Sequence, residues 1–157
     1  MAQSDLDRFD RRLLALVQRD AAQTADALAG QVGLSASAVQ RRLKRLRETG
    51  VILSEIAVID PLKAGKPNFF LAALEIERER PELIARLRQW LGAEEQIQQV
   101  YYVTGTADFV LVVVAPDVGA YDALMSRLMA DNPNVRRFTT NVALGVGKRG
   151  LFVPIAD

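Results

Sequence analysis

The densest chemistry in the sequence is a run of cations between Arg41 and Arg47. Five of these seven residues are Arg or Lys, and the other two, Leu43 and Leu46, have the spacing of residues that face a core from one side of a helix. A helix that turns its leucines inward and its cations outward presents positive charge to a polyanion. The alternative is a solvated helix face without a partner.

The residues before this run have the pattern of helices joined by tight turns. Thr24 and Ser35 are of the type that caps helix N-termini, and Gly33 is of the type that ends a helix. A first helix is predicted after Ser4, with Asp7 three residues on to complete a capping box. The pattern predicts a helix-turn-helix, whose second helix enters the DNA major groove.

This placement predicts a set of DNA-contacting residues. Glutamine can pair with adenine and arginine with guanine through two hydrogen bonds, and small residues allow close approach, so the predicted base-reading residues are Ser37, Ala38, Gln40 and Arg41. Phosphate contacts, which give salt-dependent affinity, are predicted for Lys44 and Arg45. The set is completed by Thr24, Ser35 and Arg42.

Charge is divided unevenly along the chain. Residues 1–50 hold nine Arg or Lys against six Asp or Glu, a net of +3, whereas residues 51–157 hold eleven against thirteen, a net of −2. A basic head on a mildly acidic body favours binding of a polyanion by the head. The polar N-terminus is unlike a signal peptide, and the longest apolar run, Phe109–Pro116, is far below the roughly 20 residues of a membrane span. We therefore expect a cytoplasmic protein with no membrane partner.

Neither His nor Cys occurs in the sequence. The most common general base, thiol nucleophiles and the usual zinc ligand sets are therefore missing. An enzyme built on the same architecture is the weaker alternative, and no catalytic residue, metal or cofactor is predicted.

Past Gly50 the pattern changes to extended structure at Val51–Ile59. Strands are then predicted near residues 69–76, 96–104, 109–115 and 135–144, with helices near 81–91 and 119–130. This βαββαβ order predicts an α+β fold, a ferredoxin-like antiparallel sheet with both helices on one face, following a winged helix-turn-helix. The predicted domains are residues 1–60 and 69–157, with a hinge at 61–68.

The strand at Phe109–Ala115 is apolar on both of its faces. Two helices cover only one face of a lone sheet, so we expect the other face to pack on a second copy of the chain. The same strand order also builds an RNA-binding fold, but that fold stacks bases on central aromatic residues, and here Phe109 stands among aliphatic ones. Tyr101 and Tyr102 on the neighbouring strand keep this alternative open.

Several motifs resemble the Lrp/AsnC, or feast/famine, family of regulators over nearly the whole chain. In the first half they are Leu6–Leu14, Val32–Arg42, Glu48–Ile52 and Asp60–Pro61. In the second half they are Val103–Gly105, Asp108–Phe109, Ala115–Asp117, Ala120–Tyr121 and Asn134–Val135 leading to Thr140. The resemblance implies a DNA-binding transcriptional regulator that forms homodimers, often assembled into octamers, on a roughly palindromic double-stranded operator.

The resemblance also implies an amino-acid effector bound between dimers. On matching positions the effector-binding residues are Val103, Thr104, Gly105, Thr106, Asp108 and Thr140. Asp108 could pair with an α-ammonium group, although Gly105 and Asp108 also suit a simple hairpin turn. The chain departs from the family at Thr106 and Ala107, where an acidic or polar residue and an aromatic one are usual. A different effector, or a body that only assembles the protein, stays open as an alternative.

Overall fold

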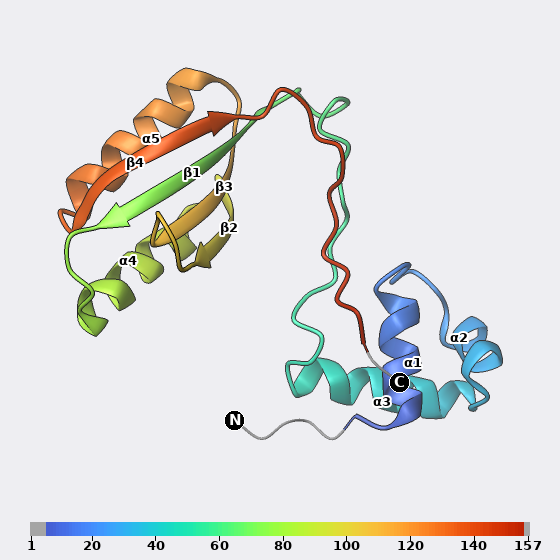
Figure 1. The fold of residues 1–157 in the computed structure, drawn as a ribbon. Coiled ribbons are helices and arrows are strands. Elements are labelled where there is room, and N and C mark those ends of the chain that lie inside the picture. Colours follow the sequence, from blue (N-terminus) through green and yellow to red (C-terminus); the bar gives the residue numbers. More distant parts are fainter. Residues whose placement is uncertain (1–5, 156–157) are drawn as a thin grey trace. The chain divides into compact units, whose positions relative to one another are not determined.

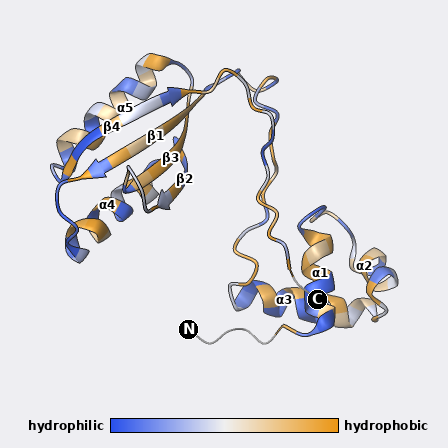
Figure 2. Cartoon of the chain, in the orientation of Figure 1, coloured by the Kyte–Doolittle hydropathy of each residue, from blue (hydrophilic) through white to orange (hydrophobic). Residues whose placement is uncertain are grey.

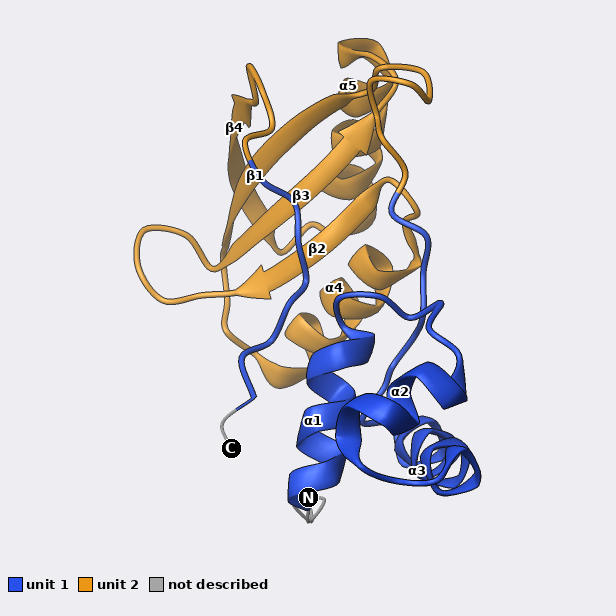
Figure 3. Cartoon of the chain, turned by 90° about the vertical axis from the view of Figure 1, so that its right-hand side faces the viewer, with its two compact units in different colours: residues 1–58, 148–157 blue, residues 59–147 orange. Residues whose placement is uncertain are grey.

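The computed structural model describes residues 6–155 and divides the chain into two compact units (Figure 3). Unit 1 contains residues 1–58 and 148–157, and unit 2 contains residues 59–147. Each unit has its own hydrophobic core. No helix in the described part of the chain is long and apolar enough to cross a membrane.

Unit 1 is built on three helices, α1 (Arg8–Val17), α2 (Ala25–Val32) and α3 (Ala36–Glu48). Thr24 and Ser35 are the N-caps of α2 and α3, as predicted. Ser4, the predicted cap of the first helix, lies outside the described residues, and α1 begins later than predicted. Its N-cap is Asp7, which forms a capping box with Asp10.

The turn between α2 and α3 depends on Gly33, whose φ of +75° is a left-handed conformation that other residues adopt only with strain. Beyond α3, the backbone N–H groups of Val51 and Ile52 both donate to the Leu46 carbonyl, at 2.9 and 3.0 Å. These two residues pack on the three-helix core. The extended stretch predicted at Val51–Ile59 forms no β-strand within the described residues, because its first residues close the end of α3 instead.

The C-terminal tail, residues 148–155, belongs to unit 1 rather than to the domain predicted for residues 69–157. Gln18 on α1 holds it with two hydrogen bonds, accepting from the Val153 N–H at 2.7 Å and donating to the Val153 carbonyl at 3.1 Å. Ile155 packs on the three-helix core, and the Arg19 guanidinium lies over the Phe152 ring. These contacts join segments 135 residues apart and hold the tail on the three-helix core.

Unit 2 confirms the predicted ferredoxin-like order (Figure 1). Its elements are β1 (Asn68–Ile76), α4 (Pro81–Ala93), β2 (Ile97–Tyr102), β3 (Phe109–Ala115), α5 (Val118–Asp131) and β4 (Val135–Val142). The strands form one sheet in the order β2-β3-β1-β4, with every neighbouring pair antiparallel. The edge strands are therefore β2 and β4.

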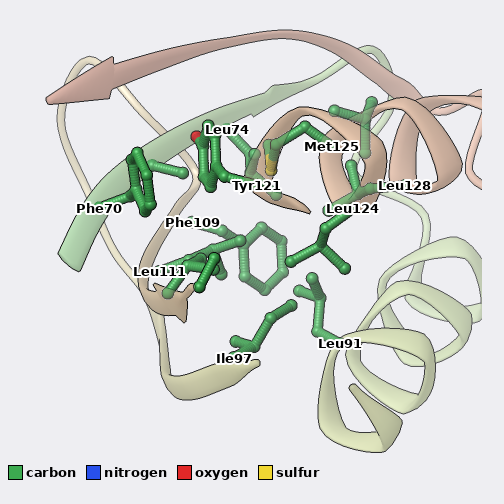
Figure 4. Packing of buried hydrophobic residues seen from close by; sticks show 14 of the residues in the cluster. Phe70, Leu74, Leu91, Ile97, Phe109, Leu111, Tyr121, Leu124, Met125 and Leu128 are labelled. Carbon is green, nitrogen blue, oxygen red and sulfur yellow. The ribbon is translucent and has the colours of Figure 1, made fainter. Parts of the chain in front are cut away.

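The two faces of this sheet differ in what covers them. On one face, Phe109, Leu111 and Val113 of β3 are fully buried in a core with residues of α4 and α5 (Figure 4). The opposite face, called the open face below, carries residues of β1, β2 and β3 that alternate with the buried ones and are largely apolar. Hydrophobic residues predominate along the central strands β1 and β3 (Figure 2). The apolar members of the open face are Phe69, Leu71, Ala73, Tyr101, Val110, Val112 and Val114.

Candidate functional site

Four of the exposed polar or charged residues of α3 lie together on the side that faces away from the three-helix core. They are Ser37, Gln40, Arg41 and Lys44, and the half-buried Ala38 lies among them in sequence. The inward side carries Val39, Leu43 and Leu46, all buried in the three-helix core. Only Lys44 of the outward residues has an ion pair, with Glu48 one turn on at 3.7 Å, and both side chains are largely exposed. Burial of one side of α3 therefore aims the predicted base-reading residues at solvent.

Thr24 and Ser35 act within the fold. The Thr24 hydroxyl accepts from the Ala27 N–H at 3.2 Å, and the Ser35 hydroxyl accepts from the Ala38 N–H at 3.3 Å. Both bonds satisfy backbone donors that the first turn of a helix leaves without partners. Ser35 also shares a hydrogen bond of 3.1 Å with the Ser37 hydroxyl, which links the cap to a predicted base-reading side chain.

Two of the predicted DNA-contacting arginines are also joined to α1. Asp10 is fully buried, and its carboxylate accepts hydrogen bonds from Arg42 at 2.9 Å and from Arg45 at 2.5 Å. Arg42 also donates to Asp7 at 2.7 Å, and its guanidinium lies over the Phe9 ring. The run of five cations thus divides into residues that face solvent and residues that fasten α3 to α1.

The same contacts shift the acidity of Asp7. The Asp10 backbone N–H, above all, holds the pKa of Asp7 below its usual range, and the hydrogen bond from Arg42 lowers it further. Burial opposes this shift. Asp7 is therefore a capping residue that favours its charged form when α3 is docked on α1.

Asp10 was not among the predicted functional residues, although the sequence contains a signal for it. It lies three residues before Leu13 and four before Leu14, on the side of α1 that is otherwise apolar. An acid at such a position must be paired, since a buried unpaired charge is very costly. The arginine run on a neighbouring helix offered the matching cations.

Five of the six predicted effector residues lie together at the turn between β2 and β3. Val103 donates its N–H to the Asp108 carbonyl at 2.9 Å, and the turn passes through Gly105 at a φ of +126°. Thr104, Gly105 and Thr106 are exposed. The Asp108 carboxylate accepts from the Ile76 N–H at 2.7 Å, so one of its oxygens already fastens the turn to β1.

Thr140 lies apart from this turn within the chain. It stands on β4, the opposite edge strand, where its hydroxyl shares a 2.6 Å hydrogen bond with the Tyr121 hydroxyl. Tyr121 is buried and stacks on Phe70 with ring centroids 4.0 Å apart (Figure 4). Burial raises the pKa of Tyr121, while the bond to Thr140 opposes that shift. A single chain therefore does not bring the six predicted residues into one pocket.

A depression of about 410 Å³ lies elsewhere in unit 2. It is lined by residues after β1, on α4 and before β4, namely Glu77, Arg78, Leu83, Arg86, Leu87, Asp131, Asn132, Pro133, Asn134 and Val135. None of the predicted effector residues lines it. Within the described residues no three His, Cys, Asp or Glu side chains are grouped so that they could hold a metal ion.

Two family models match the chain. A winged helix-turn-helix DNA-binding model matches residues 6–52, and a model described as the Lrp/AsnC ligand binding domain matches residues 70–150, more than half of the chain. The chain belongs to the Lrp/AsnC family. It follows that this Lrp/AsnC regulator is a helix-turn-helix DNA-binding transcriptional regulator, as predicted.

Similar proteins extend this assignment over nearly the full length. The Lrp/AsnC regulator is 38% identical over 151 residues to an uncharacterized HTH-type transcriptional regulator of Sinorhizobium fredii, which covers 96% of the chain and 89% of that relative. An AsnC family transcriptional regulator from Agrobacterium tumefaciens superposes with a TM-score of 0.83 at 29% identity, covering 94% and 96% of the two chains. The feast or famine regulatory protein from M. tuberculosis, solved with L-methionine, superposes at 0.77 with 29% identity, covering 92% and 95%.

Proposed function

We propose that this regulator reads its operator through the exposed side of α3. Gln40 and Arg41 pair with base edges, Ser37 and Ala38 allow the close approach, and Lys44 meets a phosphate. The observation that carries this proposal is the division of α3, whose apolar residues are buried in the three-helix core while these side chains face solvent. The regulator acts where the DNA lies, in the cytoplasm.

The DNA proposal is tested with an operator selected by the full-length protein from a random duplex library. Replacing Gln40 or Arg41 with Ala should weaken operator binding by about 1–3 kcal/mol for each lost paired contact. Arg12→Ala is the matched control, since Arg12 is an exposed cation on α1 outside the motif. Equal affinities of all four proteins for the operator would contradict the assignment.

A small amino acid bound at the turn of residues 103–108 is proposed to modulate DNA binding. The relative from M. tuberculosis was solved with L-methionine, and the second half of this chain matches a ligand binding domain. Gly105 leaves the backbone accessible, with no atom within 4 Å of the place where a Cβ would stand. Asp108 would pair with the α-ammonium group through the oxygen that the Ile76 N–H does not occupy.

Asp108→Asn separates a ligand role from a structural one. The Asn side-chain oxygen can still accept from the Ile76 N–H, so the turn should hold, whereas the negative charge opposite the ammonium group is lost. Calorimetric titration first finds which of the twenty standard amino acids the unmodified protein binds best. We expect the affinity of Asp108→Asn for that amino acid to be at least tenfold lower, with an unchanged melting temperature. No heat from any amino acid with the unmodified protein would contradict the effector proposal.

The regulator is further proposed to act as a homodimer joined through the open face of the sheet, with dimers assembling into octamers. The apolar residues of that face support the first step. An effector bound where dimers meet would then contact residues of several chains. This is compatible with the separation of Thr140 from the turn of residues 103–108 within one chain.

A further inference from the structure

The buried Asp10 carboxylate offers arginine the same partner that DNA offers. A carboxylate and a phosphate both present two oxygens that match the fork of a guanidinium group. Each oxygen of Asp10 accepts from a different arginine, one from Arg42 at 2.9 Å and the other from Arg45 at 2.5 Å. On α3, arginine side chains are therefore held by an acid within the same unit.

It is unfavourable for Arg42 or Arg45 to leave the Asp10 carboxylate and bind a DNA phosphate in its place. The Asp10 side chain is 1% exposed, so an arginine that left it for a phosphate would leave this buried charge with one arginine instead of two, although the Arg45 side chain is itself 50% exposed. Arg42 is held further by Asp7 and by the Phe9 ring. Lys44 differs, since its side chain is 75% exposed and its one pairing, with Glu48, is long at 3.7 Å.

We propose that Asp10 sets the specificity of DNA binding by withholding Arg42 and Arg45 from DNA phosphates. Contacts to phosphates supply nearly all of the affinity for non-specific DNA. By occupying two cations of the recognition helix, Asp10 lowers that affinity and leaves the base-reading side chains with a larger share of the binding energy. Asp10 is thus a positioning residue that acts on DNA through the two arginines.

The salt dependence of binding measures this directly. Each phosphate neutralised by a cation contributes about −0.9 to the slope of log K against log salt concentration. Lys44→Gln should make that slope shallower by about 0.9 for each recognition helix on the DNA, whereas Arg45→Gln, one residue along, should leave the slope unchanged. Both are measured with the full chain on a non-specific duplex and on the selected operator. An equal flattening by the two variants would overturn the proposal.

Asp10→Asn should change the salt slope in the direction opposite to Lys44→Gln. It keeps the size of the side chain but removes the charge that holds Arg42 and Arg45, so both can turn to phosphates. We expect non-specific affinity to rise, the slope to steepen by about 0.9–1.8 per recognition helix, and the ratio of operator to non-specific affinity to fall. Asp26→Asn is the control, because Asp26 is an exposed acid in the first turn of α2, and its replacement changes the net charge equally without touching the pairs of Arg42 and Arg45 with Asp10.

A purely structural role for Asp10 has a different signature. It would lower the melting temperature and weaken binding to both duplexes by the same factor, with no change of slope, and this result would overturn the proposal. Should Asp10→Asn fail to fold by circular dichroism, the comparison of Arg45→Gln with Lys44→Gln still decides, since both variants keep the buried acid.

Discussion

The open face of the sheet gives the sharpest prediction about assembly, and Leu71 is the residue to test it. Leu71 lies near the middle of β1, opposite Val112 of β3, and is 43% exposed in the single chain. If two copies meet through this face by two-fold symmetry, each dimer buries Leu71 twice. Leu71→Ala should therefore weaken the dimer without emptying a core that is already formed in the monomer.

The magnitude follows from the exposed fraction. Full burial of a leucine side chain is worth about 1.5–3 kcal/mol, so the exposed 43% of Leu71 represents roughly 1 kcal/mol per protomer and about 2 kcal/mol per dimer. At 1.4 kcal/mol for each factor of ten, the dimer dissociation constant should rise about 30-fold. Sedimentation equilibrium over a range of protein concentrations measures this constant.

The control for this prediction lies on the helix side of the sheet. Val118 begins α5 and is 61% exposed, more than Leu71, so Val118→Ala removes comparable apolar surface away from the open face. The dimer dissociation constant of Val118→Ala should match that of the unmodified protein. The reasoning is refuted if the unmodified chain is a monomer at micromolar concentration, or if the two variants weaken the dimer equally.

Three further predictions concern unit 1. Gly33→Ala should lower the stability of unit 1 by about 1–2 kcal/mol, because the φ of Gly33 is +75°. Gly30→Ala should raise that stability by about 0.5–1 kcal/mol, because Gly30 lies inside α2 with open space around the new Cβ; two changes of the same sign in thermal melts would contradict this. Ile155→Ala should cost about 1–2 kcal/mol by undocking the tail, against less than about 0.5 kcal/mol for the exposed Leu151→Ala, and equal melting temperatures would argue against docking. Because the pKa of Asp7 is lowered by folding, its charge stabilises the protein above about pH 4, and this stability is lost as the pH falls through the lowered pKa. The difference in unfolding free energy between the unmodified protein and Asp7→Asn should therefore shrink in acid, and a constant difference would exclude this linkage.

Local signals in the sequence were enough for most of the fold. Thr24 and Ser35 cap the helices they were predicted to cap, because a cap is a short-range hydrogen bond that the residue type dictates. The βαββαβ order followed from hydrophobic periodicity, with strand and helix ends shifted by no more than about two or three residues. The start of α1 was predicted too early because Asp7 lies three residues after Ser4 and three before Asp10, so its spacing suits a capping box with either residue.

The features that were missed depend on contacts between distant residues. Nothing in the sequence of the tail, which follows Gly145 and Gly147 and contains Gly150, indicates that Val153 pairs with Gln18. The six effector positions carried over from the resemblance likewise gave no information on which of them share a face of the sheet. Only the strand order shows that β2 and β4 are opposite edges.

The arginine run shows that neighbouring cations on one helix have different surroundings. Arg42 is half-buried and Arg45 half exposed, yet both pair with the buried Asp10 of α1. Arg47 is paired as well, with Glu55 at 2.8 Å. The positive charge that DNA meets is therefore fixed jointly by α3 and by the acids facing it. If Asp10 withholds both arginines as we propose, its removal changes the salt dependence of binding by at least as much as the removal of Lys44.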